Sequence, residues 1–240
     1  MLYHKLNYLK IGNGKRKIVF LHGWGANAKT FVAVANSMQN CTCYLIDLYG
    51  FGNTHLPKPM DTYDYAMQLY LFFVSHNINN FTLVGHSFGG RIAIILSSIF
   101  NLKVNKLVLI ASAGLRPKHT LFTKIKVKSY KFCKYMVKIH LFPSCVLKNF
   151  GSKDWQQTSS WLRITMIKVV NQYLDYLTHK IVCPTLIVWG TKDKTTPTYM
   201  ARRLHRNIAN SRVVFYKLNH FVYVDNYNFC ALLNNFVLGR

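Results

Sequence analysis

The sequence predicts an α/β fold, with a mostly parallel β-sheet and helices on both of its faces. Short apolar runs of strand length alternate with longer stretches of helical pattern. Around Ser87, a strand pattern passes into a helix pattern through a glycine-rich turn. The 240 residues suit one domain, or one domain with an insertion, and half of them are hydrophobic, so a sizeable core can form.

The same patterns place the individual elements. The chain opens with two strand-like runs on either side of Gly12-Asn13-Gly14, which predicts a β-hairpin. From the second run onward, strands are predicted at residues 18–21, 43–46, 82–84, 107–110, 186–188 and 213–216. Helices are predicted at about residues 28–38, 61–76, 89–100, 199–208 and 226–236.

One region interrupts this alternation. Between Gly114 and about His179 there is no clear strand pattern, and lysine and aromatic residues are frequent. We interpret the region as a helical insertion that lies over the ends of the strands. The sequence thus predicts a core formed by residues 1–114 and 180–240, and a helical cap, or lid, formed by residues 115–179.

The first part of the cap has the pattern of a basic amphipathic helix. Within residues 121–142, lysines recur near helical spacing and apolar residues form a second stripe, and a second helix is predicted over about 155–176. The lysine face is either a solvated surface over ordinary packing or a surface that attracts an acidic protein or an anionic membrane. Its lysines are Lys124, Lys128, Lys131, Lys134 and Lys138.

The overall composition is strongly basic. There are 31 Lys and Arg residues against 7 acids, which gives a net charge of +24. This charge favours acidic partners, but an AT-biased genome would also enrich lysine, asparagine and tyrosine, and both explanations can hold. No motif for nucleic-acid recognition is present, so no nucleic-acid partner is expected. All seven acids are aspartates, so acid–base chemistry must use Asp, His, Tyr, Cys or Lys.

The cysteines and the apolar stretches bear on cofactors and localisation. The six cysteines form no CxxC pair, and Cys41 and Cys43 fall on one face of a strand, which indicates packing and no metal or cofactor. The amino-terminal residues lack the apolar run of a signal peptide. Residues 81–100 are apolar, but Ser87 and Arg91 within them fit a strand–turn–helix better than a membrane span. We therefore expect a cytoplasmic protein.

The turn at Gly85-His86-Ser87-Phe88-Gly89 has the form G-x-S-x-G. A strand that becomes a helix within one residue forces that residue into a strained backbone conformation, and small neighbours let the flanking segments approach. The serine hydroxyl then stands above the edge of the sheet, over a helix amino terminus. This context favours a nucleophile over a simple glycine turn with a capping serine, and makes Ser87 the candidate.

A serine hydroxyl needs a base to remove its proton. In this arrangement an acid and then a histidine are expected in later loops that follow strands. Asp193 follows the predicted strand 186–188, and His220 follows the predicted strand 213–216. Asp225 is a competing acid, but it falls at the start of the last predicted helix, where an aspartate would serve as a cap.

A tetrahedral oxyanion requires two hydrogen-bond donors. The backbone N–H of Phe88, directly after the candidate nucleophile, is one candidate. The second is the backbone N–H of Trp24, in the loop His22-Gly23-Trp24-Gly25 after the first predicted strand of the core. His22 precedes Ser87 in the chain and lies in the loop that would shape this site, so we interpret it as a structural hydrogen-bonding residue.

These residues belong to motifs that resemble the α/β-hydrolase superfamily, in particular its small bacterial members with a helical cap. The motifs are HGWGANAKTF, IDLYGFGNTHLP, VGHSFGGRIAI, KLVLIASAGLRP, TLIVWGTKDKTTP and NHF. The resemblance covers almost the whole chain. It implies the α/β-hydrolase fold, a catalytic triad of Ser87, Asp193 and His220, and an oxyanion hole formed by the N–H groups of Trp24 and Phe88.

The sequence departs from the family pattern in two loops. In IDLYGFGNTHLP, Tyr49 stands where proline is common and Thr54 where serine is usual. Before His220, the usual Gly-x-Gly becomes Lys217-Leu218-Asn219, so two glycines are missing. The second departure bears directly on the geometry of the loop that carries the candidate base.

The sequence therefore predicts a serine hydrolase that cleaves carboxylic ester or thioester bonds through an acyl-enzyme. Two alternatives stay open. HGWG followed by the D-x-x-G-F-G loop is similar to the esterases that cleave pimeloyl-carrier-protein methyl ester in biotin synthesis, and the lysines at 124, 128 and 131 would suit an acidic carrier protein. The altered loop before His220 would also fit a non-catalytic binding protein that keeps the fold.

Overall fold

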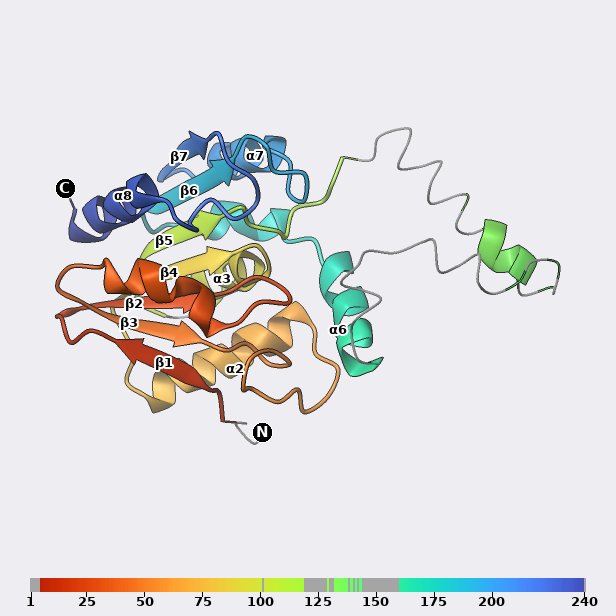
Figure 1. Cartoon of the computed structure of the whole chain (residues 1–240), viewed down its shortest axis with the longest axis horizontal. Helices are drawn as coiled ribbons and strands as arrows, with labels where there is room; N and C mark the ends of the chain where they lie inside the picture. The colour runs from red at the N-terminus through yellow and green to blue at the C-terminus, as the bar shows by residue number, and fades with distance from the viewer. Residues whose placement is uncertain are drawn as a thin grey trace.

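Seven strands form one sheet in the part of the chain that the structure describes. The computed structural model describes residues 5–100, 102–118 and 160–239 and, between the last two ranges, residues 129, 132–137, 139, 141 and 143. The strand order is β1-β3-β2-β4-β5-β6-β7 (Figure 1). β1 runs antiparallel to β3 and the other neighbouring pairs are parallel, which confirms the predicted mostly parallel sheet. The strands are β1 Tyr8–Ile11, β2 Arg16–Leu21, β3 Cys41–Ile46, β4 Phe81–His86, β5 Val104–Ile110, β6 Thr185–Gly190 and β7 Ser211–Tyr216.

Helices pack on both faces of the sheet. Residues of α2, α3 and α7 join one buried cluster, and residues of η1, α1 and α8 join a second cluster on the opposite face. The first three are α2 Thr62–Ser75, α3 Phe88–Ser98 and α7 Tyr199–Asn207. The second three are the 3₁₀ helix η1 Ala28–Phe31, α1 Val32–Asn36 and α8 Tyr227–Leu238.

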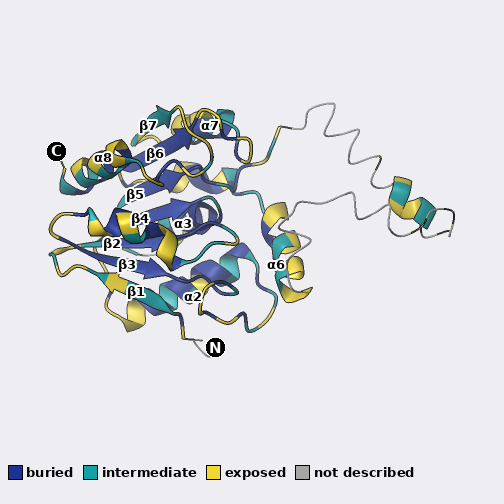
Figure 2. Cartoon of the chain, viewed as in Figure 1, coloured by how far each residue is buried: buried dark blue, intermediate teal, exposed yellow. Residues whose placement is uncertain are grey.

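The strands explain why both faces are covered. In β2, Val19 and Leu21 belong to the first cluster, whereas Ile18 and Phe20 belong to the second. Successive side chains of a strand point to opposite faces, and a parallel strand that is buried on both sides is apolar at every position. Figure 2 shows β4 and β6, which lie inside the sheet, buried along their whole length.

The predicted amino-terminal hairpin is wrong. β1 pairs with β3 instead of β2, and β2 lies between β3 and β4. The glycines serve a close crossing over the start of β3: a Cβ on Gly12 would lie 2.4 Å from the Cys41 carbonyl oxygen. The Gly14 N–H also donates to that carbonyl oxygen at 3.1 Å. Glycine is needed here because two backbone segments approach closely. In the sequence, the same Gly-Asn-Gly pattern is also typical of a tight turn.

The helices lie close to their predicted positions, and their caps explain where they start. Asp61 accepts from the Asp64 N–H at 2.9 Å while Asp64 accepts from the Asp61 N–H at 2.9 Å, a reciprocal capping box at the start of α2. The predicted cap of the last helix needs a correction. Asn226, and not Asp225, accepts from the Phe229 N–H at the start of α8, and Asp225 lies one residue earlier with φ of 49°.

Two further helical segments follow the gap in the described residues. α6 (Ser160–Asn171) lies beyond the ends toward which the parallel strands point, and η3 (Asp175–Lys180) returns the chain to the sheet (Figure 1). Of the expected basic helix, residues 132–137 are helical and include Lys134; Lys124, Lys128, Lys131 and Lys138 lie outside the described residues. Among the described residues, no helix has both the length and the apolar character needed to cross a bilayer.

Candidate active site

Ser87 lies at the sharp bend between β4 and α3. Its φ of 51° and ψ of −107° lie outside the regions that L-residues prefer. Such a conformation costs roughly 1–3 kcal/mol and persists only where the surroundings hold it. Three backbone contacts do so: the Ser87 N–H donates to the Ile110 carbonyl oxygen at 3.0 Å, and the Ser87 carbonyl oxygen accepts from Ala113 and Arg91.

The glycines beside Ser87 allow this bend. A Cβ on Gly85 would lie 2.6 Å from the Gly89 carbonyl oxygen, and a Cβ on Gly89 would lie 2.1 Å from the Leu21 carbonyl oxygen. Any side chain at either position would push α3 away from β4 or β2. The strand-to-helix turn predicted around Ser87 is thus present, with the glycines required by packing.

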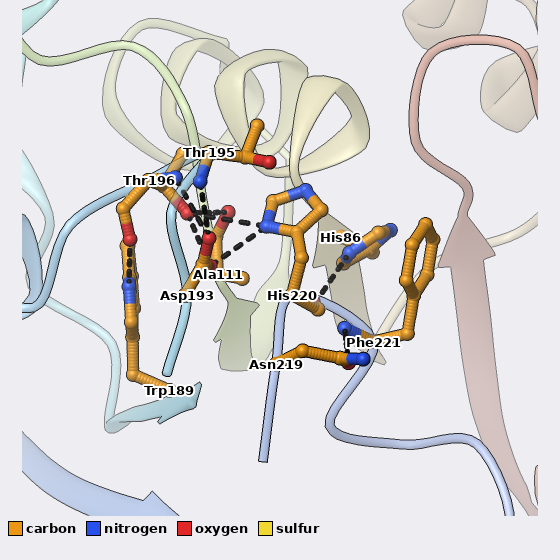
Figure 3. A network of polar contacts seen from close by, with 9 residues as sticks. All are labelled: His86, Ala111, Trp189, Asp193, Thr195, Thr196, Asn219, His220 and Phe221. Carbon is orange, nitrogen blue, oxygen red and sulfur yellow. Dashed lines mark hydrogen bonds and ion pairs between the residues drawn. The ribbon is translucent and has the colours of Figure 1, made fainter. Parts of the chain in front are cut away.

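Asp193 and His220 form a hydrogen-bonded pair at the same edge of the sheet. Their loops follow β6 and β7, and the Nδ1 atom of His220 lies 2.7 Å from Oδ2 of Asp193. The Asp193 side chain is fully buried and the His220 side chain is only 12% exposed. Figure 3 shows the second ring nitrogen of His220 turned away from Asp193. Because Nδ1–H donates to the carboxylate, Nε2 carries the free lone pair.

Backbone and hydroxyl donors surround the Asp193 carboxylate (Figure 3). Oδ1 accepts from the Thr195 N–H at 2.8 Å and from the Thr196 N–H at 2.9 Å, and Oδ2 accepts from the Thr196 hydroxyl at 2.8 Å. Burial alone would raise the pKa of Asp193, but the hydrogen bonds from His220 and Thr196 outweigh it and lower the pKa. Asp193 is therefore held as a carboxylate.

The loop of His220 packs against the residue that precedes Ser87. The rings of His86 and His220 have centroids 4.8 Å apart, and Nε2–H of His86 donates to the His220 carbonyl oxygen at 3.2 Å. The structure thus brings the acid–base pair beside the bend, even though the glycines usual before the base are absent. Ser87 Oγ makes no hydrogen bond to another described residue.

The two candidate oxyanion donors lie in the loop after β2 and at the first residue of α3. Their side chains touch, since the ring centroids of Trp24 and Phe88 are 5.3 Å apart. A Cβ on Gly23 would lie 3.4 Å from the Cβ of Ser87, so the loop of Trp24 passes directly over the serine. Within the described residues, neither the Trp24 N–H nor the Phe88 N–H donates to a protein acceptor, so both are available to a ligand.

Two buried polar residues hold this loop. Nδ1 of His22 lies 2.8 Å from the Gly23 carbonyl oxygen, and its Nε2 accepts from the Leu48 N–H at 3.0 Å, as expected for a structural hydrogen-bonding residue. Asp47 accepts from the Ala28 N–H at 2.7 Å and thereby fixes the other end of the loop. Neither side chain reaches outward to a substrate.

Sequence reasoning missed Thr196. Its hydroxyl contacts Asp193 Oδ2, lies 3.3 Å from Nδ1 of His220 and is 3.1 Å from the Ala111 carbonyl oxygen. The signal available in the sequence was a β-branched hydroxyl residue three positions after the acid. Threonines are common in loops, and Thr195 stands beside Thr196, so the sequence alone does not show which of the two hydroxyls contacts Asp193.

Comparison with known proteins identifies the family of the chain. The sequence pattern of the Alpha/beta hydrolase family matches residues 18–231. An AB hydrolase superfamily protein, YisY of Bacillus subtilis, is 30% identical over 232 residues, covering 85% of this chain and 84% of that protein. The Pimeloyl-[acyl-carrier protein] methyl ester esterase of Wigglesworthia glossinidia brevipalpis is 23% identical over 256 residues, covering 95% of each chain.

A solved structure shares the fold. The esterase EaEST from Exiguobacterium antarcticum superimposes with a TM-score of 0.77 at 24% identity, covering 97% of this chain and 95% of that one. The family match spans most of the chain and includes the bend at Ser87 and both loops of the acid–base pair. The chain therefore belongs to the Alpha/beta hydrolase family.

Proposed function

We propose that the protein is a serine hydrolase of carboxylic esters or thioesters, with Ser87 as nucleophile, His220 as base and Asp193 as the acid that orients it. The observation that carries the proposal is the 2.7 Å hydrogen bond between His220 Nδ1 and Asp193 Oδ2 beside the strained bend at Ser87. Relatives named as esterases and lipases support the same reaction class.

The geometry suggests how the reaction proceeds. Nε2 of His220 takes the proton from Ser87 Oγ as that oxygen attacks the carbonyl carbon. The N–H groups of Trp24 and Phe88 stabilise the negative oxygen that forms. The imidazolium then gives its proton to the leaving alcohol or thiol as the carbon–oxygen or carbon–sulfur bond breaks. Water, activated by the same nitrogen, finally attacks the acyl-enzyme and releases the acid.

Substitution of the nucleophile tests this function. Ser87→Ala should lower kcat for p-nitrophenyl esters by at least about 10³-fold, because the residual rate of such variants comes from binding and the oxyanion donors alone. The measurement is steady-state hydrolysis over a series of acyl lengths. Ser98→Ala is a matched control on α3, since its hydroxyl donates to the Ile94 carbonyl oxygen within the helix.

A fluorophosphonate probe separates catalysis from mere ligand binding. The wild-type protein and Ser98→Ala should be labelled, and Ser87→Ala should not. An unlabelled wild-type protein that still binds esters would instead support the non-catalytic alternative. Undiminished hydrolysis by Ser87→Ala would rule out the assigned nucleophile.

A second candidate is an esterase that acts on a carrier-protein-linked methyl ester. The relative named as a pimeloyl-[acyl-carrier protein] methyl ester esterase matches over 95% of this chain, and the net charge of +24 suits an acidic carrier. The predicted docking lysines Lys124, Lys128 and Lys131 lie outside the described residues. The same triad would perform the chemistry.

Charge reversal tests the carrier-protein substrate. Replacing Lys124, Lys128 and Lys131 together by glutamate should raise KM for a carrier-linked methyl ester about tenfold or more, because steering and docking by these charges are lost. Hydrolysis of a small p-nitrophenyl ester should be unchanged. The matched control reverses Lys15, Arg16 and Lys103, which are exposed where β2 and β5 begin. Equal loss on both substrates would contradict docking.

A further inference from the structure

His22 is fully buried, and both of its ring nitrogens have backbone partners. The Leu48 N–H donates to Nε2 at 3.0 Å. A ring nitrogen that accepts a hydrogen bond carries no proton, so the proton of the neutral ring lies on Nδ1. Nδ1–H therefore donates to the Gly23 carbonyl oxygen, 2.8 Å away.

The Gly23 carbonyl belongs to the same peptide group as the Trp24 N–H. A trans peptide group is planar, so its C=O and N–H bonds point in opposite directions, and the described chain contains no cis peptide bond. The Ala26 N–H also donates to this carbonyl oxygen, at 3.2 Å. With two donors on its oxygen, the peptide group cannot rotate without breaking both hydrogen bonds.

The position of this peptide group is also fixed relative to the bend at Ser87. The carbonyl oxygen of His22 accepts from the Gly89 N–H at 3.0 Å, which joins the loop directly to the first turn of α3. The Gly23 Cα lies against Ser87, because a Cβ built there would be 3.4 Å from the serine Cβ. The side of the peptide that carries the free N–H is thus held next to the serine.

We infer that His22 is a positioning residue for the oxyanion hole: by holding the Gly23 carbonyl, it turns the Trp24 N–H toward the oxygen that becomes negative during the reaction. This inference rests on the proposed function. Burial lowers the pKa of His22 to about 4, so the ring stays neutral and keeps its Nδ1–H tautomer at neutral pH.

Two substitutions distinguish the two hydrogen bonds made by the His22 ring. In His22→Asn, the side-chain amide nitrogen can occupy the place of Nδ1 and keep the bond to the Gly23 carbonyl, while the bond from Leu48 is lost. In His22→Gln, the side-chain carbonyl oxygen can occupy the place of Nε2 and keep the bond from Leu48, while the bond to Gly23 is lost. Each variant loses one hydrogen bond, so thermal unfolding should report similar destabilisation.

The kinetic outcomes should differ. His22→Gln should lower kcat for a p-nitrophenyl ester about 100-fold, the cost of one misdirected oxyanion donor, whereas His22→Asn should lose less than about tenfold. KM should change by less than about twofold in both, because the donor acts in the transition state. Inhibition by a trifluoromethyl ketone, which forms an oxyanion adduct with a serine, should weaken in His22→Gln by the same factor as kcat.

A measurement on the wild-type protein does not depend on variants that fold. With ¹⁵N-labelled histidine, the NMR signals of His22 should show the proton on Nδ1 from pH 8 to pH 5, with His22→Asn used for assignment. A proton on Nε2, or equal loss of kcat in both variants, would overturn the inference. A wild-type protein without esterase activity or fluorophosphonate labelling would instead count against the proposed function.

Discussion

At the scale of single residues, the acid of the proposed triad depends on more than its histidine partner. Thr196 gives Asp193 both a backbone and a hydroxyl hydrogen bond, and its own carbonyl oxygen accepts from the indole N–H of Trp189 at 2.6 Å. The Thr196 hydroxyl has one proton, so it can be given to Asp193 or to the Ala111 carbonyl oxygen, but not to both. The closer of the two acceptors is the carboxylate.

Thr196→Val should lower kcat about tenfold at nearly constant KM. The substitution keeps the shape and the backbone N–H but removes one hydrogen bond to a charged group, worth about 1.5–3 kcal/mol. The carboxylate then orients the imidazole less firmly. Thr195→Val is the matched control, because only the backbone N–H of Thr195 contacts Asp193. Steady-state kinetics of both variants provide the test, and equal kcat values would show that the hydroxyl has no positioning role.

At the scale of elements, α3 supports both the serine and α6. Arg91 is buried one turn after Ser87, and its guanidinium donates to the carbonyl oxygens of Val169, at 2.5 Å, and Gln172 at the carboxyl end of α6. A cation is favourable there because the helix dipole is negative at that end. Burial lowers the pKa of Arg91 to about 10, so it stays charged at neutral pH. Arg91 thus attaches α6 to the core.

Arg91→Met should loosen α6 while leaving the sheet intact. The variant loses hydrogen bonds to a charged group, which are worth about 1.5–3 kcal/mol. The fraction of molecules with α6 opened should therefore rise about tenfold or more, and the rate of trypsin cleavage after Lys168 should rise by the same factor. Limited proteolysis followed by mass spectrometry measures the rate at this site. Arg202→Met, on the exposed side of α7, is the control and should leave the rate unchanged. An equal rate in Arg91→Met would contradict the attachment.

Elements also show what the sequence can and cannot predict. The order of strands and helices, the bend at Ser87 and the loops of Asp193 and His220 follow from local patterns, because each pattern reports burial or backbone geometry at its own position. The hairpin prediction failed because Gly12 and Gly14 are required by the close approach of the backbone at the start of β3, which is distant in the sequence. The hydroxyl of Thr196 and the ring of His22 likewise gain their partners only when separate loops meet.

At the scale of the whole molecule, few charged groups control the response to acid. The chain has only seven acids, so two buried histidines carry much of this response. Burial is the main reason that the pKa of His22 falls to about 4 and the pKa of His86 to about 3. Histidines in the unfolded chain titrate near pH 6.5. Between pH 6.5 and 4 the unfolded state therefore binds more protons than the folded state, so stability falls as the pH falls.

The free energy of unfolding should decrease by about 3 kcal/mol for each of these two histidines between pH 7 and pH 4. The Asp193 pKa, which is lowered in the folded state, adds a further loss at lower pH. Urea titrations at pH 7, 6, 5 and 4 measure the slope. In His22→Asn, the slope of the unfolding free energy against pH should correspond to about one fewer proton taken up on unfolding. Constant stability across this range would mean that the two rings are not buried as neutral groups.

The placement of the carboxylates has a consequence for the surface. Asp47, Asp61, Asp64, Asp175 and Asp193 all accept hydrogen bonds from the chain's own N–H groups. These carboxylates keep their charge, but seven acids cannot balance 31 Lys and Arg residues, so dissolved anions must form the neutralising atmosphere around the protein. Two copies approaching one another would therefore repel, and the repulsion would weaken with ionic strength, over a range of about 8 Å at physiological salt.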